Sequence, residues 1–179
     1  MNRRAGVAEP VVHPLDRAHA GAAVDAVFAG LSTQSRYLRF HSPVPRLPES
    51  VRARLVDVDG RRHAAVVAEV PGLGPIGLGQ VFGPGTGTAD VAVAVVDAWQ
   101  RRGVGTLLLT ALAALAEEIG YSELRGSVLP ENVAMQRLAR KVLPWARPWF
   151  DGDTVWFTAP IGPAAWTVTH EDLVADLLR

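Results

Sequence analysis

The amino-acid sequence predicts an α/β (α+β) fold in which helices flank a mixed, mainly antiparallel β-sheet. Short apolar stretches separated by turn residues over 63–96 indicate a three-strand meander. A helical apolar pattern over 104–119 then leads to a further strand at 122–129, which indicates one parallel crossover. Two aromatic strands, at 145–150 and 154–159, surround the turn sequence DGD and complete the pattern.

The first third of the chain is predicted to form one strand and three helices. Residues 7–13 form the strand, which Pro14 closes. Asp16 caps a helix that stops at Gly30, because an aspartate accepts hydrogen bonds from the free amides of a first turn and glycine suits a helix end. Two further helices cover 32–40 and 49–57, with the proline-rich loop 41–48 between them.

The middle of the chain holds the strands of the meander and the strongest helix. Strands are predicted at 64–70 and 76–82, joined by a turn at 71–75. After the loop 83–88, residues 90–96 form a continuous run of small apolar side chains, which suits a central strand covered on both faces. The helix 104–119 has one apolar face, since its large apolar residues recur every three or four positions, and Gly120 ends it.

Two helices are predicted in the last third. After the strand 122–129, Pro130 breaks the chain, and Asn132 caps a helix that runs through Val142. Thr169, with Asp172 three residues later, resembles the start of a final helix. No repeat or linker divides the pattern, so we expect residues 1–179 to form a single domain.

Composition narrows the class of protein. The formal net charge is zero, so no overall charge favours nucleic acid or an anionic membrane. The chain has no cysteine, which excludes disulfides, a thiol nucleophile and thiolate metal sites, and the five histidines lack metal-ligand spacing, so no metal is expected. The longest apolar stretch, 107–116, is far shorter than a membrane span. We expect a cytoplasmic protein without a membrane or nucleic-acid partner.

The sequence QRRGVG at 100–105 carries the main chemical signal. Gly103 and Gly105 have no side chain to block a ligand, so backbone amides at the start of the following helix can converge on an anion. This pattern predicts a pyrophosphate site, although an ordinary strand-to-helix turn gives the same two glycines. A Walker loop is excluded because no Gly-Lys-Ser/Thr run exists, and a dinucleotide fingerprint is excluded because the third glycine is missing.

This sequence resembles the acetyl-CoA loop, Q/R-x-x-G-x-G/A, of the GNAT superfamily of N-acetyltransferases. The resemblance extends over about 7–141 and includes LSTQSRYLRF (31–40), VDVDGRRHAAVVAE (56–69), DVAVAVVDAWQRRGVGTLLL (90–109) and VLPENVAMQRLARK (128–141). These segments look like the subgroup that contains the catalytic domain of bacterial protein-lysine acetyltransferases. The resemblance implies a GNAT-type fold and acetyl-CoA as co-substrate.

The resemblance also assigns residues to the acetyl-CoA site. It implies that the strand edge at Val93, Ala94 and Val95 pairs with the pantetheine arm. It implies that the pyrophosphate is held by Arg101, Arg102, Gly103, Val104, Gly105 and Thr106. Asn132 matches an asparagine that commonly contacts the cofactor in this family, and it is equally suited to be a simple helix cap.

Asp90 is the candidate general base. A lysine amine must lose its proton before it attacks a thioester, which costs about 4–5 kcal/mol at pH 7. Lysine acetyltransferases of the resembling subgroup commonly have glutamate at this place, so the shorter aspartate favours a bridging water. The alternative for Asp90 is a solvated residue at the strand start.

Many family members also use a tyrosine in the helix after Asn132 to protonate the leaving thiolate. The only tyrosines here are Tyr37 and Tyr121, and neither matches that position, so another donor serves or the thiolate leaves without one.

The expected partner is an amine acceptor, with protein lysine favoured. Two alternatives stay open: a small-molecule amine acetyltransferase, and a non-catalytic module that senses acyl-CoA. The resemblance places Arg36, Tyr37 and Arg39 on the early helices that border the acceptor groove. Several tryptophans in the tail either pack the last strands, wall the acceptor pocket or form a homodimer contact; they are Trp145, Trp149, Trp156 and Trp166.

Overall fold

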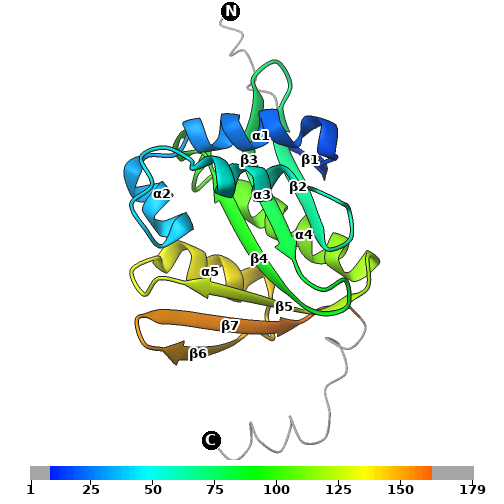
Figure 1. Cartoon of the computed structure of the whole chain (residues 1–179). Helices are drawn as coiled ribbons and strands as arrows, with labels where there is room; N and C mark the ends of the chain where they lie inside the picture. The colour runs from blue at the N-terminus through cyan, green and yellow to red at the C-terminus, as the bar shows by residue number, and fades with distance from the viewer. Residues whose placement is uncertain (1–8, 163–179) are drawn as a thin grey trace, which may run out of the picture.

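A seven-stranded sheet forms the centre of the protein, in a computed structural model that describes residues 9–162 (Figure 1). The strand order is β1-β2-β3-β4-β5-β7-β6, and every neighbouring pair is antiparallel except β4 and β5. The predicted mixed, mainly antiparallel sheet with one parallel crossover is therefore confirmed. The strands are β1 (Val11–Pro14), β2 (His63–Val70), β3 (Gly74–Phe82), β4 (Gly87–Val95), β5 (Tyr121–Val128), β6 (Arg147–Asp151) and β7 (Thr154–Pro160).

Helices cover both faces of this sheet. On β3, Leu78 and Gln80 face α1 and α3, and the Gln80 amide donates to the Leu55 carbonyl of α3 at 2.8 Å. The preceding Gly77 faces α4, where an added Cβ would lie only 2.7 Å from Leu108 Cδ1. The small residue thus lets α4 pack closely. The helices are α1 (Arg17–Ala29), α2 (Thr33–Phe40), α3 (Glu49–Val56), the short 3₁₀ helix η1 (Asp97–Trp99), α4 (Val104–Glu118) and α5 (Val133–Val142).

The predicted helix starts are confirmed by their capping hydrogen bonds. Asp16 accepts from the His19 amide at 2.9 Å, Ser32 from the Ser35 amide at 3.2 Å, and Asn132 from the Met135 amide at 3.1 Å. These local bonds explain why the sequence alone located α1, α2 and α5. Within residues 9–162, no helix is long and apolar enough to cross a bilayer.

Several boundaries differ from the sequence prediction; β4, for example, begins at Gly87 inside the predicted loop 83–88, and β6 begins at Arg147 rather than at 145. The first strand begins at Val11, and the predicted 71–75 turn is shorter because β3 already starts at Gly74. Gly72 and Gly74 both have positive φ, 80° and 94°, a conformation that lets the chain reverse tightly between β2 and β3. The final helix predicted at Thr169 and the tryptophan at 166 lie outside the described residues.

A buried polar pair interrupts the apolar core beneath α3. His63 is only 7% exposed and stacks on Phe82 with ring centroids 4.2 Å apart. Its Nδ1 lies 3.0 Å from the Asp57 carbonyl, and its Nε2 lies 3.0 Å from the Gln80 amide nitrogen. Since that amide nitrogen can only donate, Nε2 must accept, and the single ring proton sits on Nδ1. Burial lowers the pKa of His63 below its usual 6.5.

Acidification from pH 7 to pH 5 should therefore destabilise the protein through His63. The unfolded histidine binds a proton near pH 6.5 while the folded one resists it, so stability present above pH 6.5 is lost as pH falls through the folded pKa. Each unit of separation corresponds to about 1.4 kcal/mol. Urea unfolding of the wild type and His63→Gln across this range measures the effect, with the exposed His19→Gln as control. An equal fall in His63→Gln would show that another group is responsible.

Candidate functional site

The parallel strands β4 and β5 pair over a short distance and then separate. Their register runs from Gly87 opposite Tyr121 to Asp90 opposite Arg125, and β5 continues along β7 as far as Val128. Figure 1 shows the two strands converging at one end and diverging at the other. On its other side β4 remains paired with β3 up to Val95. Within the described part of the chain, the edge of β4 over 91–95 therefore has no strand partner on the β5 side and offers free backbone groups, except for the Val95 carbonyl, which accepts from Gln100.

A cavity of about 620 Å³ occupies the space between the separated strands. α2 borders one side of it, and α5 and the end of β5 border the other. This volume is typical of a site for a sizeable small molecule. Most of the residues predicted for the acetyl-CoA site line it: Val93, Ala94, Val95, Arg101, Gly103, Gly105, Thr106 and Asn132.

The loop between β4 and α4 is shaped by two residues with left-handed backbone. Arg101 has φ 57° and Gly103 has φ 86°, and α4 begins immediately afterwards at Val104. Such a turn at a helix start directs backbone amides towards one point, where a negative charge is favoured. A left-handed conformation is uncommon for arginine and costs free energy, as is often seen at functional sites. The Gln100 amide supports the loop by donating to the Ser35 hydroxyl at 3.1 Å and the Val95 carbonyl at 3.0 Å.

Not every side chain of this loop points into the cavity. The Arg102 guanidinium lies 5.1 Å from the centre of the Trp99 ring, and Arg102 is outside the cavity lining. The Val104 side chain is 1% exposed and packs in the core, so this residue can offer a ligand only its backbone. Arg101 is thus the cationic side chain of the loop that borders the cavity.

Asn132 both caps a helix and lines the cavity. Its Oδ1 accepts from the Met135 amide at 3.1 Å, which begins α5. Its amide nitrogen makes no hydrogen bond within residues 9–162 and so remains available to a ligand. The two interpretations of Asn132 are therefore compatible in one geometry.

Asp90 lies where the β4–β5 pairing ends. Its carboxylate accepts two hydrogen bonds from Arg125, from Nε at 2.7 Å and from Nη2 at 3.1 Å. The carboxylate hydrogen bond raises the pKa of the Arg125 guanidinium. Both side chains are about half exposed, and Asp90 stands just outside the cavity lining.

The three early-helix candidates have different environments. Arg36 donates to the Pro45 and Phe28 carbonyls at 2.8 and 3.2 Å, which fixes α2 to its neighbours. The charge of Glu131, with which Tyr37 shares a hydrogen bond, raises the pKa of that tyrosine. Arg39, by contrast, lines the large cavity. Of these three candidates, Arg39 is the one that faces a space for substrate.

The other tyrosine is structural. The Tyr121 hydroxyl donates to the Arg61 carbonyl at 3.1 Å and accepts from the Gly85 amide at 3.0 Å, and its ring is buried. Neither Tyr37 nor Tyr121 is part of the cavity lining. In the described region, no tyrosine therefore stands ready to protonate a leaving thiolate in the cavity.

His41 is a cavity residue that the sequence analysis did not single out. It ends α2 with φ 55° and borders the large cavity. Burial and the neighbouring Arg39 lower its pKa, so the ring is neutral at physiological pH. A lone histidine without a recognisable motif gives no signal in the sequence, and only the position of α2 brings it to the site.

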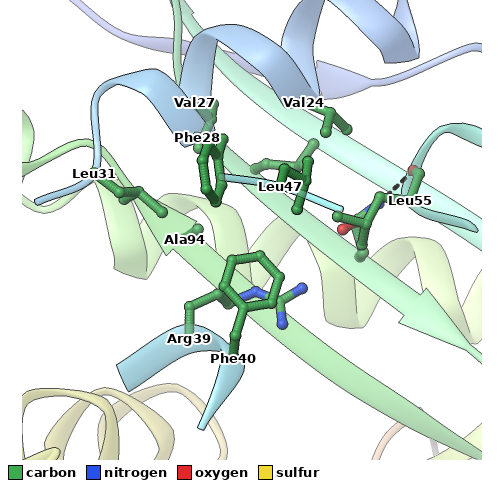
Figure 2. Close-up of a pocket in the computed structure, with 11 residues that line it drawn as sticks. Val24, Val27, Phe28, Leu31, Arg39, Phe40, Leu47, Leu55 and Ala94 are labelled. Carbon is green, nitrogen blue, oxygen red and sulfur yellow. Dashed lines mark hydrogen bonds between the residues drawn. The ribbon is translucent and has the colours of Figure 1, made fainter. Parts of the chain in front are cut away.

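A small apolar pocket adjoins the large cavity beside α2. It measures about 20 Å³, roughly the space of one water molecule, and shares Leu31, Arg39, Phe40 and Ala94 with the large cavity. Figure 2 shows Arg39 and Phe40 entering it from the side opposite Val27 and Phe28.

Trp145, Trp149 and Trp156 line neither space, whereas Phe157 of β7 lines the large cavity. Trp149 of β6 stacks on Trp156 of β7 with ring centroids 5.5 Å apart. Trp149 is nevertheless 44% exposed. Packing of the last strands thus accounts for this pair only in part, and the homodimer contact stays a prediction.

Comparison with known proteins agrees with this geometry. A family model described as an acetyltransferase (GNAT) domain matches residues 12–142. The acetyltransferase Pat of Mycolicibacterium smegmatis is 31% identical over 120 residues, which cover 65% of this chain and 36% of that protein. The chain thus spans about a third of the length of this curated relative.

Solved structures share the fold at low sequence identity. The GNAT domain of S. lividans PAT superposes with a TM-score of 0.75 at 24% identity, covering 89% of this chain and all of that one. A GNAT superfamily phosphinothricin acetyltransferase from Sinorhizobium meliloti, solved in complex with acetyl-CoA, gives a TM-score of 0.68 at 14% identity, covering 91% and 96% of the two chains. The family match over most of the chain, together with the diverging strands and the glycine turn, shows that this chain belongs to the GNAT family of acetyltransferases.

Proposed function

We propose that this protein transfers an acetyl group from acetyl-CoA to a primary amine, with protein lysine as the favoured acceptor. The observation that carries the proposal is the single cavity in which the free edge of β4 leads to the glycine turn at the start of α4. A pantetheine arm contains amides that can pair with a strand edge, and a pyrophosphate suits a helix N-terminus. Residues 93–95 would hold the first, and residues 101–106 the second, with Asn132 as a further contact.

Acetyl transfer requires a neutral amine. It also requires that the negative charge that develops on the thioester carbonyl oxygen be stabilised. The amine nitrogen bonds to the thioester carbonyl carbon, the C–S bond breaks, and the amine proton passes through water to Asp90 while the thiolate departs. A bridging water is favoured, since Asp90 lies outside the cavity lining and its side chain is short. A backbone amide of β4 near Val95 would meet the negative charge on the carbonyl oxygen.

The preference for protein lysine rests on the similarity to Pat, which covers only about a third of that protein. Nothing in the geometry of the cavity requires a protein acceptor. A small-molecule amine is the second candidate, and the observation that favours it is the shared fold with a phosphinothricin acetyltransferase from Sinorhizobium meliloti. The non-catalytic acyl-CoA sensor differs from both in a single outcome, since it binds acetyl-CoA without turnover.

Saturating acetyl-CoA should raise the melting temperature of the protein by about 5–10 °C. A ligand at 100 times its Kd stabilises the folded state by about 2.7 kcal/mol, and a chain of this size gains about 2–4 °C per kcal/mol. Differential scanning fluorimetry measures this shift, with ADP and free pantetheine as partial ligands. Acetylation of a lysine peptide and of small amines then identifies the acceptor. If no CoA ester shifts the melting temperature, the proposed function is wrong.

A further inference from the structure

Arg39 stands at the junction of the two cavities. It lines both the large cavity and the small apolar pocket, and Ala94 of the free β4 edge lines both as well. The pocket walls opposite Arg39 are apolar side chains from α1 and the 41–48 loop, among them Val27, Phe28 and Leu47 (Figure 2). The guanidinium therefore lies beside the part of β4 where the reacting groups of the proposed transfer would meet.

The Arg39 guanidinium has no acceptor within residues 9–162. Its recorded contact is with the ring of Phe40, 5.1 Å from the ring centre. Some other arginines of the protein have an acid partner, such as Arg52 with Asp25 at 2.7 Å and Arg125 with Asp90 at 2.7 Å. Burial lowers the pKa of Arg39 to about 10, so the side chain still carries its charge at neutral pH. The side chain is only partly buried and lines the open cavity, so an anionic ligand would replace the water around the guanidinium with charge-assisted hydrogen bonds.

The surroundings indicate what kind of anion would bind. A guanidinium presents parallel N–H donors that match a carboxylate in a two-pronged hydrogen bond. The neighbouring pocket, of about 20 Å³, is too small for a phosphate. Gln80 offers the anion no donor, because its amide nitrogen is engaged by Leu55 and His63, so Arg39 is the group that would bind it.

We propose that Arg39 binds a carboxylate carried by one of the two reacting molecules. This rests on the proposed acyl transfer and names its substrate class. The carboxylate has two possible sources. It belongs either to the acyl group, as in succinyl-CoA, or to the amine, as in an α-amino acid. In both cases Arg39 is a specificity-determining residue next to the reaction centre.

Two pairs of substrates distinguish these sources. The acyl pair is succinyl-CoA against acetyl-CoA with the same lysine peptide. The amine pair is L-leucine against isopentylamine with acetyl-CoA, since the two amines differ only in the carboxylate. The wild type should favour the carboxylate-bearing member of one pair by at least about 10-fold in kcat/KM, the discrimination expected of one charge-assisted pair. Calorimetric binding of the same ligands gives a readout that does not depend on turnover.

Variants assign the preference to Arg39. Arg39→Met should reduce the ratio of kcat/KM within the favoured pair by about 10–100-fold, and Arg39→Lys should give an intermediate ratio because it keeps the charge without the planar fork. The exposed Arg54→Met on α3 is the matched control and should keep the wild-type ratio. Without ligand, Arg39→Met should melt no lower than the wild type, since it removes an unpaired charge.

The outcomes distinguish a failure of this inference from a failure of the proposed acyl transfer on which it rests. A preference in the acyl pair or in the amine pair that Arg39→Met abolishes supports the proposal and identifies the source of the carboxylate. Equal rates within both pairs, a preference that survives in Arg39→Met, or a clear loss of stability in the ligand-free variant would overturn it. Failure of the wild type to bind any CoA ester would instead refute the proposed function itself.

Discussion

Replacing Gly105 with glutamate should weaken acetyl-CoA binding at least about 100-fold, a loss of about 2.8 kcal/mol. Gly105 is the second residue of α4 and lines the large cavity directly after the left-handed turn. A carboxylate there would occupy the place of the pyrophosphate and repel it. The same carboxylate is favourable to the helix itself, where a negative charge near the N-terminus contributes about 0.3–1 kcal/mol. The ligand-free variant should therefore remain folded while its binding, measured by calorimetry, is lost.

Two further substitutions separate charge from size at this position. A Cβ on residue 105 would lie 3.1 Å from Leu138 Cδ2, a contact that this flexible side chain can relieve by a small shift. Gly105→Ala should accordingly retain most of the affinity. Gly105→Gln has the size of glutamate without its charge and should fall between the two. If Gly105→Glu binds acetyl-CoA like the wild type, the pyrophosphate is held elsewhere.

Removing the carboxylate of Asp90 should lower kcat by about 10²–10⁴-fold, the usual contribution of general-base assistance. Asp90→Asn is the sharper variant, because it keeps the size of the side chain and one acceptor oxygen for Arg125. The KM for acetyl-CoA should change little, since Asp90 lies outside the cavity lining. Stability should change by less than about 1 kcal/mol, as is usual for a half-exposed ion pair. Steady-state kinetics and urea unfolding measure the two effects.

Further variants at Asp90 and Arg125 test whether a loss of kcat comes from the loss of a general base. Asp90→Glu should retain substantial activity, because it keeps a carboxylate that can accept the proton. Arg125→Gln should not abolish activity, because it frees the carboxylate from its ion pair. Full turnover of Asp90→Asn at neutral pH would refute the base assignment. His41, held neutral at the cavity wall, would then be the next residue to test, through the loss of activity as pH falls below 6.5.

The parts of this fold that local chemistry determines could be predicted from the sequence. Helix starts are marked by Asp16, Ser32 and Asn132, whose side chains accept hydrogen bonds from backbone amides three residues later. The glycine pair at 103 and 105 likewise indicates a turn before a helix. In each case the residues that make the contact lie within a few positions of one another, so the pattern is visible in the chain.

Features that depend on the packing of distant segments could not be predicted in this way. The partner of Asp90 is Arg125, 35 positions away, and the pair is visible only once β4 and β5 are aligned. Arg39 was recognised as a candidate contact through the family resemblance alone. Its position between two cavities follows from how α2 docks near Ala94, which no periodicity encodes.

Because β4 pairs with β5 over only a short distance, the sheet consists of two groups of strands, here called panels, and the β4–β5 pairing that joins them is here called the seam. One panel comprises β1 to β4, the other β5 to β7, and four register pairs connect them. α4 packs against strands of both panels and so bridges the seam from one face. A ligand that hydrogen-bonds along residues 91–95 would extend the seam as a non-protein strand. A bound ligand would then connect the two groups of strands and restrict their relative motion. This motion would be smallest with substrate bound and would increase when the product leaves.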